Sequence, residues 1–315
     1  MIETRFTRAF GLTHPVLAAP MANVAGGALA AAVCSAGGLG VIGGGYCDPE
    51  WIATQVAAAG NTPVGVGFIT WRLSEAPGLL ERELARNPRA VFLSFGDFAA
   101  YQPVIRAAGV PLIAQVQTLA DARHAVAAAA DVIVAQGAEA GGHGNGRATL
   151  TLVPEVADML VAEAPDVLLL AAGGIVDGRG LAAALTLGAD GVVCGTRFWA
   201  SAEALRPEGQ LPQALAADGD ATIRTSVGDV ARGFDWPGGW ALRSLRNDFV
   251  KRWSDDLPGL AEDDTARAAW ISGAEAAPIV GEGIGVIHDA PPAAKILDRM
   301  SAEAAAILAG GWRKG

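Results

Sequence analysis

Two glycine-bearing segments could hold a phosphate group through backbone atoms. The first is AAGGI at 171–175 and the second is CGT at 194–196, and each follows an apolar run. Glycine lets the backbone approach an anion closely, and a helix N-terminus adds a favourable dipole. One such pair would be expected to serve only as a turn, whereas two pairs at neighbouring strand ends favour a phosphate site. The residues predicted to surround the phosphate are Ala172, Gly173, Gly174, Gly195 and Thr196.

A single histidine lies in a glycine-rich stretch of the chain. His143 stands in AQGAEAGGHGNG, residues 135–146, which contains five glycines. This glycine content excludes a helix, so His143 is not expected to pack on a helix face. An imidazole can act as an acid or a base near neutral pH, or it can stabilise a negative charge. His143 is therefore the candidate catalytic residue, whereas His14, His124 and His288 are expected to be structural.

Further candidate contacts lie at the ends of other apolar runs. The first run ends in Ala19–Met21, where Pro20 has no backbone donor and Met21 offers a soft apolar surface to a flat ring. By itself this pattern is weak, because every strand has to end somewhere. Gln115 and Gln136 end two later runs. Their amides could bind the carbonyls and nitrogens of a ring, or they could satisfy loop backbone.

These candidates depend on eight short apolar runs that alternate with alanine-rich stretches of helical composition. Buried parallel strands read as near-continuous apolar runs. Strand and helix repeated eight times predict an α/β protein of the (β/α)₈ TIM-barrel class, with an open doubly wound sheet as the alternative. In a barrel, loops at the carboxyl ends of the strands carry the active site. The runs begin near Pro15, Gly38, Pro63, Ala90, Pro111, Asp131, Val167 and Gly191.

Two segments break the rhythm of strand and helix. The interval from Asp131 to Val167 is long because it contains the His143 loop. Residues 200–285 contain prolines, paired acids and four tryptophans without a strand-like period, which predicts a mainly helical insertion after the eighth strand. We expect 1–199 and 286–315 to form the barrel, with its eighth helix near 292–308. The insertion could be a mobile lid, or equally a scaffold or dimer surface.

Composition excludes several classes of protein. The net charge of −10 argues against a nucleic-acid binder, which would carry a basic stripe. The three cysteines form no CxxC pair, so a reducing, cytoplasmic compartment is expected. The N-terminal residues lack the apolar region of a signal peptide, and no run is long enough to span a membrane. No metal-binding motif, Walker A motif or GxSxG elbow occurs.

Taken together, the motifs resemble those of the nitronate monooxygenases, formerly called 2-nitropropane dioxygenases, which are FMN-dependent barrels. The resemblance extends over nearly the whole chain. The matching segments are APM at 19–21, SAGGLGVIGGG at 35–45, IVAQGAEAGGHGN at 133–145, AAGGIVDGRGLAAALTLGADGVVCGTRF at 171–198 and GEGIGVIHDAPPAAKIL at 281–297.

The resemblance implies an activity and a cofactor. Small alkyl nitronates or nitroalkanes would be oxidised by O₂ to a carbonyl compound and nitrite. His143 would act as the base on a neutral nitroalkane, or would stabilise the bound nitronate. The expected cofactor is FMN, and its partners would be the small substrate and O₂. The predicted cofactor contacts are Ala19, Pro20, Met21, Gln115, Gln136, Gly141, Gly142, Ala172, Gly173, Gly174, Gly195 and Thr196.

The chain departs from the family at two strands, and these departures leave other functions open. It has Gly67 where many relatives carry the asparagine of GVN, and Ala114 and Gln115 where many carry a lysine or a histidine–lysine pair. One alternative is an NAD(P)H-dependent flavin reductase acting on quinones or on enoyl groups of an acyl carrier protein, although the net negative charge disfavours an acidic carrier. Another is a flavin-binding protein without catalysis. A homodimer is the assembly considered.

Overall fold

Eight parallel strands form the closed barrel that the apolar runs predict. The computed structural model describes residues 2–311, so residues 1 and 312–315 of the predicted barrel segments lie outside the described residues. The strands pair in the order β1-β2-β3-β4-β5-β6-β8-β9, and β9 pairs with β1, which excludes the open sheet. They are β1 (Val16–Ala18), β2 (Leu39–Gly43), β3 (Gly65–Ile69), β4 (Val91–Ser94), β5 (Leu112–Val116), β6 (Val132–Gln136), β8 (Leu168–Ala172) and β9 (Gly191–Cys194).

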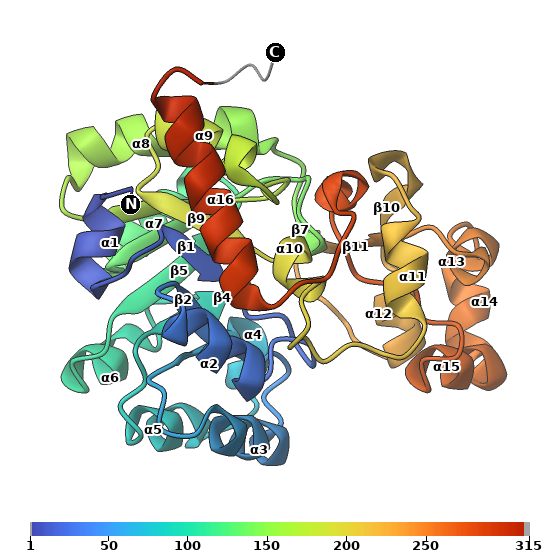
Figure 1. Ribbon diagram of the computed structural model, residues 1–315. Coiled ribbons are helices and arrows are strands. Elements are labelled where there is room, and N and C mark those ends of the chain that lie inside the picture. The colour runs from blue at the N-terminus through green and yellow to red at the C-terminus, as the bar shows by residue number, and fades with distance from the viewer. Residues whose placement is uncertain (1, 312–315) are drawn as a thin grey trace.

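Helices follow the strands and cover the outside of the barrel (Figure 1). The last helix, α16 (Ala293–Leu308), packs on α9 and α2, and so closes the ring as predicted. No helix in the described part of the chain is both long enough and apolar enough to cross a membrane. The helices that precede residue 200 are α1 (Arg5–Phe10), α2 (Gly27–Ser35), α3 (Pro49–Ala59), α4 (Thr70–Leu73), α5 (Leu79–Leu84), α6 (Gln102–Ala107), α7 (Leu119–Ala127), α8 (Thr149–Glu163), α9 (Gly178–Thr186) and α10 (Thr196–Trp199).

Capping residues next to the helices fix the residue at which each helix begins. They also fix where the preceding loop at the catalytic face ends. The side chain of Asp48 accepts hydrogen bonds from the first turn of α3, and Pro49 occupies its first position. Thr118 caps α7 in the same way. Asp177 caps α9 by accepting from the N–H of Gly180, directly after the AAGGI segment.

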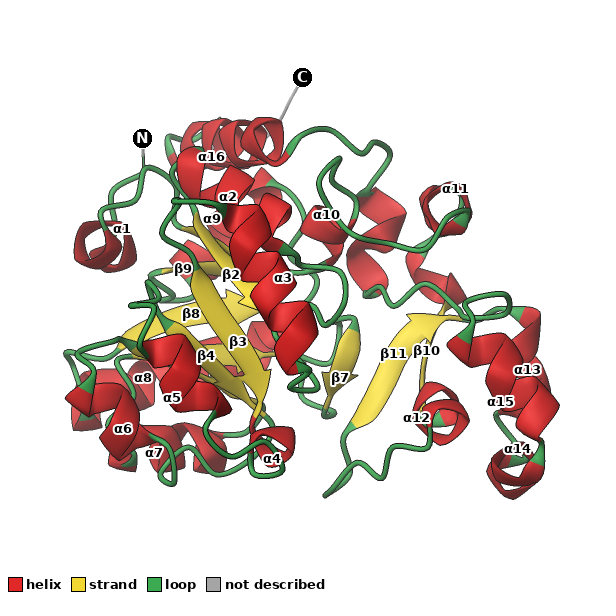
Figure 2. Ribbon diagram, turned by 90° about the horizontal axis from the view of Figure 1, so that it is seen from below, coloured by secondary structure: helices red, strands yellow, loops and turns green. Residues whose placement is uncertain are grey.

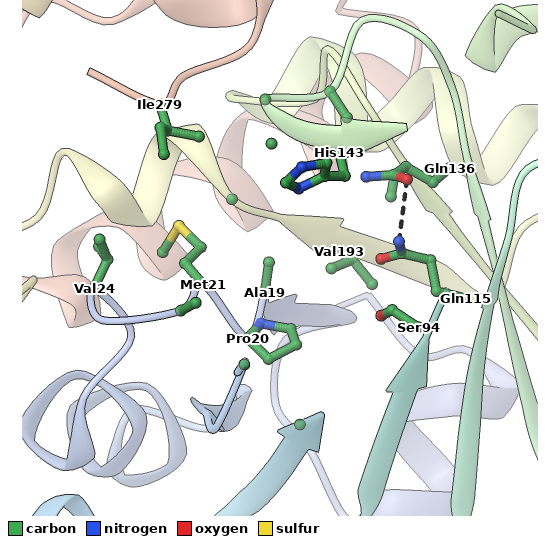
Figure 3. A pocket seen from close by; sticks show the side chains of 18 of the residues that line it. Ala19, Pro20, Met21, Val24, Ser94, Gln115, Gln136, His143, Val193 and Ile279 are labelled. Atoms are coloured by element: carbon green, nitrogen blue, oxygen red, sulfur yellow. Dashed lines mark hydrogen bonds between the residues drawn. The ribbon is translucent and has the colours of Figure 1, made fainter. Parts of the chain in front are cut away.

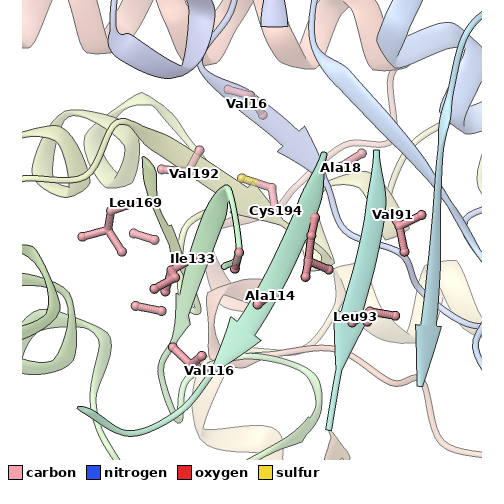
Figure 4. Packing of buried hydrophobic residues seen from close by; sticks show 14 of the residues in the cluster. Val16, Ala18, Val91, Leu93, Ala114, Val116, Ile133, Leu169, Val192 and Cys194 are labelled. Carbon is pink, nitrogen blue, oxygen red and sulfur yellow. The ribbon is translucent and has the colours of Figure 1, made fainter. Parts of the chain in front are cut away.

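Side chains alternate between the inside and the outside of the barrel. On β5 and β6, Ile113 and Val134 point inward and join the cluster inside the barrel, which Phe6 of α1 also enters. Ala114 and Ile133 point outward and pack in the layer between strands and helices (Figure 4). Side chains along a strand alternate with a period of two residues. The next inward residues towards the carboxyl ends of the strands therefore form the floor of a binding site at that end of the barrel.

The segment 200–285 is mainly helical, but the expectation that it lacks strands was wrong. Strands β10 (Thr222–Thr225) and β11 (Ala241–Leu245) form an antiparallel sheet with β7 (Gly142–Gly144), which lies in the His143 loop (Figure 2). The sequence ALRSL is short and does not alternate between apolar and polar residues, so it carries no strand signal. The helical elements are α11 (Gln210–Leu215), η1 (Gly219–Ala221), α12 (Val227–Arg232), α13 (Asp248–Trp253), α14 (Leu257–Glu262), α15 (Asp264–Ile271) and η2 (Glu282–Val286).

The insertion has a core of its own and a second apolar contact with the barrel. Val227, Phe249 and Trp270 belong to a cluster formed by its helices. A separate cluster joins it to the barrel, where Trp199 of α10 packs with Leu245 and Ile284. The insertion is thus anchored to the barrel by a buried apolar cluster and by a shared sheet.

Candidate active site

A pocket of about 1300 Å³, including its mouth, lies at the carboxyl ends of the barrel strands. Ser94, Gln115 and Gln136 are the last inward residues of β4, β5 and β6, and all line the pocket (Figure 3). On β3 the corresponding residue is Gly67, where an added Cβ would lie 2.4 Å from Cβ of Pro20. The glycine at this position is therefore required by the close approach of Pro20.

One end of the pocket presents unpaired backbone donors. Gly173 and Gly174 follow β8 with φ angles of 107° and 71°, which favour glycine. Gly195 and Thr196 follow the neighbouring strand β9. Within residues 2–311, none of the N–H groups of these four residues donates a hydrogen bond to the protein. The Thr196 hydroxyl oxygen accepts from the N–H of Gly281, which ties this end to the returning chain.

A chain of amide groups fixes the orientation of Gln136. Trp240 Nε1 can only donate, and it donates to Oε1 of Gln117 at 2.9 Å. The Gln117 amide nitrogen therefore donates to Oε1 of Gln136 at 2.7 Å, and Gln115 donates to the same oxygen at 3.1 Å. The amide N–H groups of Gln136 remain as donors on the side of the pocket. Trp240 belongs to the insertion, so this row of hydrogen bonds connects the insertion to the barrel floor.

His143 lies on β7, opposite Leu242 of β11, rather than in an irregular loop. Its Nε2 atom is 2.9 Å from each carboxylate oxygen of Asp229, a residue of α12. Its ring stacks on Trp236 with a centroid distance of 3.4 Å and an interplanar angle of 13°. The imidazole lines the pocket together with Gln136 (Figure 3).

The surroundings of His143 favour the neutral imidazole. Burial is the largest influence and lowers the pKa of His143 below its ordinary value. The hydrogen bond and the negative charge of Asp229 raise this pKa, whereas the positive charges of Arg232 and Arg224 lower it. The net effect lowers the pKa of His143, which favours the neutral ring.

Two arginines of the insertion hold the backbone of the His143 loop. Arg224 of β10 donates to the carbonyl oxygens of Ala138 at 2.9 Å, Ala140 at 3.3 Å and Ala241 at 2.6 Å. Arg243 of β11 donates to Ala138 as well, at 3.1 Å. Burial lowers the pKa of Arg224 to about 10, so it stays charged at neutral pH. The guanidinium groups thereby satisfy carbonyls that the glycine-rich loop cannot pair by itself.

Three aromatic side chains, Tyr46, Phe95 and Trp236, form a wall beside His143, which we call the aromatic wall. The rings of Phe95 and Trp236 meet edge to face at 5.1 Å. Arg232 lies over the Tyr46 ring at 5.4 Å, and within residues 2–311 it is the only lysine, arginine or acidic residue that lines the pocket. The pocket therefore combines apolar rings with one positive charge.

Every residue predicted from the sequence for the cofactor or for catalysis lines this pocket. The histidines expected to be structural lie elsewhere: His14 is buried against Ser301, His124 pairs with Asp97 on the surface, and His288 is exposed. The sequence did not identify Asp229, Arg232 or the aromatic wall. Only the cluster of tryptophans in 200–285 drew attention to that part of the chain.

Comparisons with known proteins agree on one family. The family model described as nitronate monooxygenase matches residues 3–77 and 78–303. Nitronate monooxygenase npaC of Metarhizium robertsii is 37% identical over 333 residues, covering 93% of this chain and 91% of that protein. The structure of FabK from Thermotoga maritima matches with a TM-score of 0.85 at 29% identity, covering 98% of both chains.

A nitroalkane oxidase from Streptomyces ansochromogenes matches with a TM-score of 0.79 at 26% identity, over 95% of this chain and 98% of that one. The match to the family model covers most of the chain, and the relative from Metarhizium robertsii aligns over nearly its whole length. The chain therefore belongs to the nitronate monooxygenase family of flavin-dependent oxidoreductases.

Proposed function

We propose that this protein uses bound FMN and O₂ to oxidise small alkyl nitronates to a carbonyl compound and nitrite. The observation that carries the proposal is a buried His143 in the same pocket as the unpaired N–H groups after β8 and β9. The overall reaction balances when two nitronates and one O₂ give two carbonyl compounds and two nitrite ions. Membership of the family supports the same reaction.

The donor groups of the pocket fit FMN. Four backbone N–H groups would bind the phosphate without any basic side chain. They are those of Gly173, Gly174, Gly195 and Thr196. The amide N–H groups of Gln136 would donate to a carbonyl or nitrogen of the ring. Ala19, Pro20, Met21, Gln115, Gly141, Gly142 and Ala172 would complete the contacts. When bound, FMN would accept electrons from the substrate and pass them to O₂.

The protein's own groups would bind the substrate and move its proton. A neutral nitroalkane would give its proton to the imidazole of His143, whereas a nitronate needs no base. Arg232 is well placed to attract the anionic form, because it is the only charged residue among the described residues that line the pocket. The aromatic wall would exclude water from the reacting atoms, which strengthens these electrostatic contacts.

The decisive experiment uses the purified protein with its visible spectrum. We expect a flavin spectrum that bleaches when a nitronate is added without oxygen. Admitting O₂ should restore the spectrum and release nitrite. A flavin that remains oxidised in the presence of nitronate would contradict the proposal.

A second candidate is an NAD(P)H-dependent flavin reductase. The aromatic wall supports it, because flat rings such as nicotinamide stack well on aromatic side chains. The same anaerobic experiment separates the two candidates. Bleaching by NADH or NADPH but not by nitronate would favour the reductase, and bleaching by none of them would favour a binding protein without catalysis.

A further inference from the structure

The insertion places a buried carboxylate, that of Asp229, against His143 and outside the pocket lining. The side chain of Asp229 is only 4% exposed, and that of His143 only 7%. One oxygen of Asp229 also accepts a hydrogen bond from Arg232 at 2.9 Å. A carboxylate is costly to bury unless charged or hydrogen-bonding partners compensate. Arg232 supplies that compensation through its ion pair with Asp229.

The contact with Asp229 fixes where the proton sits on a neutral imidazole. A carboxylate only accepts hydrogen bonds, so the nitrogen that faces it, Nε2, must carry the hydrogen. The other nitrogen, Nδ1, then holds the free lone pair. Among residues 2–311, Nδ1 has no hydrogen-bond partner, so it stays available on a ring that lines the pocket. Stacking on Trp236 restricts rotation of the ring out of this orientation.

We infer that Asp229 is the positioning residue that keeps His143 protonated at Nε2, with Nδ1 as the atom that receives the substrate's proton. This inference rests on the proposed function in one respect, namely that a neutral nitroalkane donates the proton. When the proton moves, the C–H bond breaks, its electron pair stays on the substrate as the nitronate, and the new N–H bond forms at Nδ1. The resulting imidazolium has Asp229 beside it.

The charged groups that face His143 come from the insertion. Asp229 and Arg232 lie on α12, and Arg224 lies on β10. Asp229 is the only one of the three that raises the pKa of His143. Removing its charge therefore leaves a weaker base and an imidazole with no fixed tautomer.

The first test compares two substrates in the variant Asp229→Asn. We expect turnover of the neutral nitroalkane to fall about 100-fold, the scale of general base catalysis, while turnover of the nitronate changes far less. Asp229→Glu should recover part of the loss, because it restores the carboxylate. The matched control is Asp248→Asn, which removes an almost fully exposed carboxylate from the same insertion. Equal losses on both substrates, or no loss on either, would overturn the inference.

The second test does not depend on activity. The chain has only four histidines, so ¹⁵N spectra of the full-length, FMN-loaded protein are simple, and His143→Gln identifies the signals of His143. We expect a protonated Nε2 and an unprotonated Nδ1 near neutral pH. In Asp229→Asn this preference should weaken, and the pKa of His143 should fall further. An unchanged tautomer and pKa in the variant would refute the role of Asp229.

The two tests also separate this inference from the proposed function. If the unmodified protein oxidises neither nitronate nor nitroalkane, the proposed function fails, and the spectra still decide whether Asp229 sets the tautomer. If it oxidises both but the spectra show hydrogen on Nδ1, the function stands and the inference fails.

Discussion

The two ends of the pocket are built in different ways. The end after β8 and β9 uses backbone N–H groups of adjacent strands, and the parallel ladder of the barrel sets their positions. The end at His143 depends on side chains and strands of the insertion: Asp229 and Trp236 hold the ring, and Arg224 holds the loop. The proposed phosphate site is thus a local product of the barrel, whereas the reactive group is held by a distant segment.

The largest effect is expected when the reactive group, His143, is removed, because this should change turnover without changing FMN binding at the other end of the pocket. His143→Gln should lower turnover of neutral nitroalkanes by about 100-fold or more, because it removes the general base. FMN content should stay unchanged, since the unpaired N–H groups are untouched. Steady-state oxygen consumption and the flavin absorbance of the purified variant measure both quantities. His124→Gln, on the surface, is the control. Loss of FMN from His143→Gln would show that the two ends are coupled.

A substitution at the other end, among the glycines after β8, should weaken binding of FMN. Gly174 has a φ of 71° and faces no close contact that would forbid a side chain, so Gly174→Val mainly strains the backbone. We expect FMN to bind about tenfold more weakly, which corresponds to roughly 1.4 kcal/mol. Fluorescence titration of the apoprotein measures this affinity. Gly60→Val is the matched control, because Gly60 also has a positive φ and open space but lies outside the pocket. Equal weakening in both variants would refute the assigned role of Gly174.

A smaller effect is expected from loosening the His143 loop. Arg224→Leu removes the side-chain donor from the partly buried carbonyls of Ala140 and Ala241, whereas Ala138 keeps Arg243, and an unsatisfied buried group costs about 1–3 kcal/mol. We expect lower thermal stability and a loss of turnover smaller than that of His143→Gln, with FMN retained. Melting temperature and kcat check this outcome, with the exposed Arg246→Leu as control. Weaker FMN binding in Arg224→Leu alone would contradict the independence of the two ends.

The smallest effect is a shift along the pH axis. Burial lowers the pKa of His143, so its imidazole stays unprotonated at pH values below the ordinary pKa of a histidine. The acid limb of kcat/KM for a neutral nitroalkane should therefore lie below about pH 6.5. Folding responds in the same sense: the stability that depends on neutral His143 is present above its unfolded pKa and is lost as pH falls towards the folded value. A limb above pH 6.5 would show that Asp229 outweighs burial.

The part of the molecule predicted from the sequence is the part encoded locally. The eight strands were found because each is a continuous apolar run, and the glycine pairs because they directly follow two of these runs. His143 was found because its glycine-rich neighbourhood excludes a helix. Each of these signals needs only a few consecutive residues, and each lies on the barrel or in its loops.

What the sequence left hidden is encoded over long separations. Asp229 is one acid among many, and nothing in its neighbours indicates that it meets a histidine 86 residues earlier in the chain. Trp236 and Arg224 carry no local pattern either. Strands β10 and β11 are four and five residues long and contain arginines, and ALRSL does not alternate between apolar and polar residues, so neither predicts a sheet. Their role depends on pairing with β7, which has no strand signal of its own.

The shared sheet of β7, β10 and β11 also bears on the order in which a newly synthesised chain can become active. The glycine pairs are synthesised well before residues 222–245. That later segment supplies β10 and β11, which form the sheet with β7, and Asp229, whose carboxylate contacts His143. The last helix, α16, is made later still, and it closes the ring against α2 and α9. A chain that stops within the insertion keeps the residues of the proposed phosphate site but lacks α16, and a stop before Asp229 also leaves His143 without its carboxylate. Reactivity is therefore among the last properties that the growing polypeptide acquires.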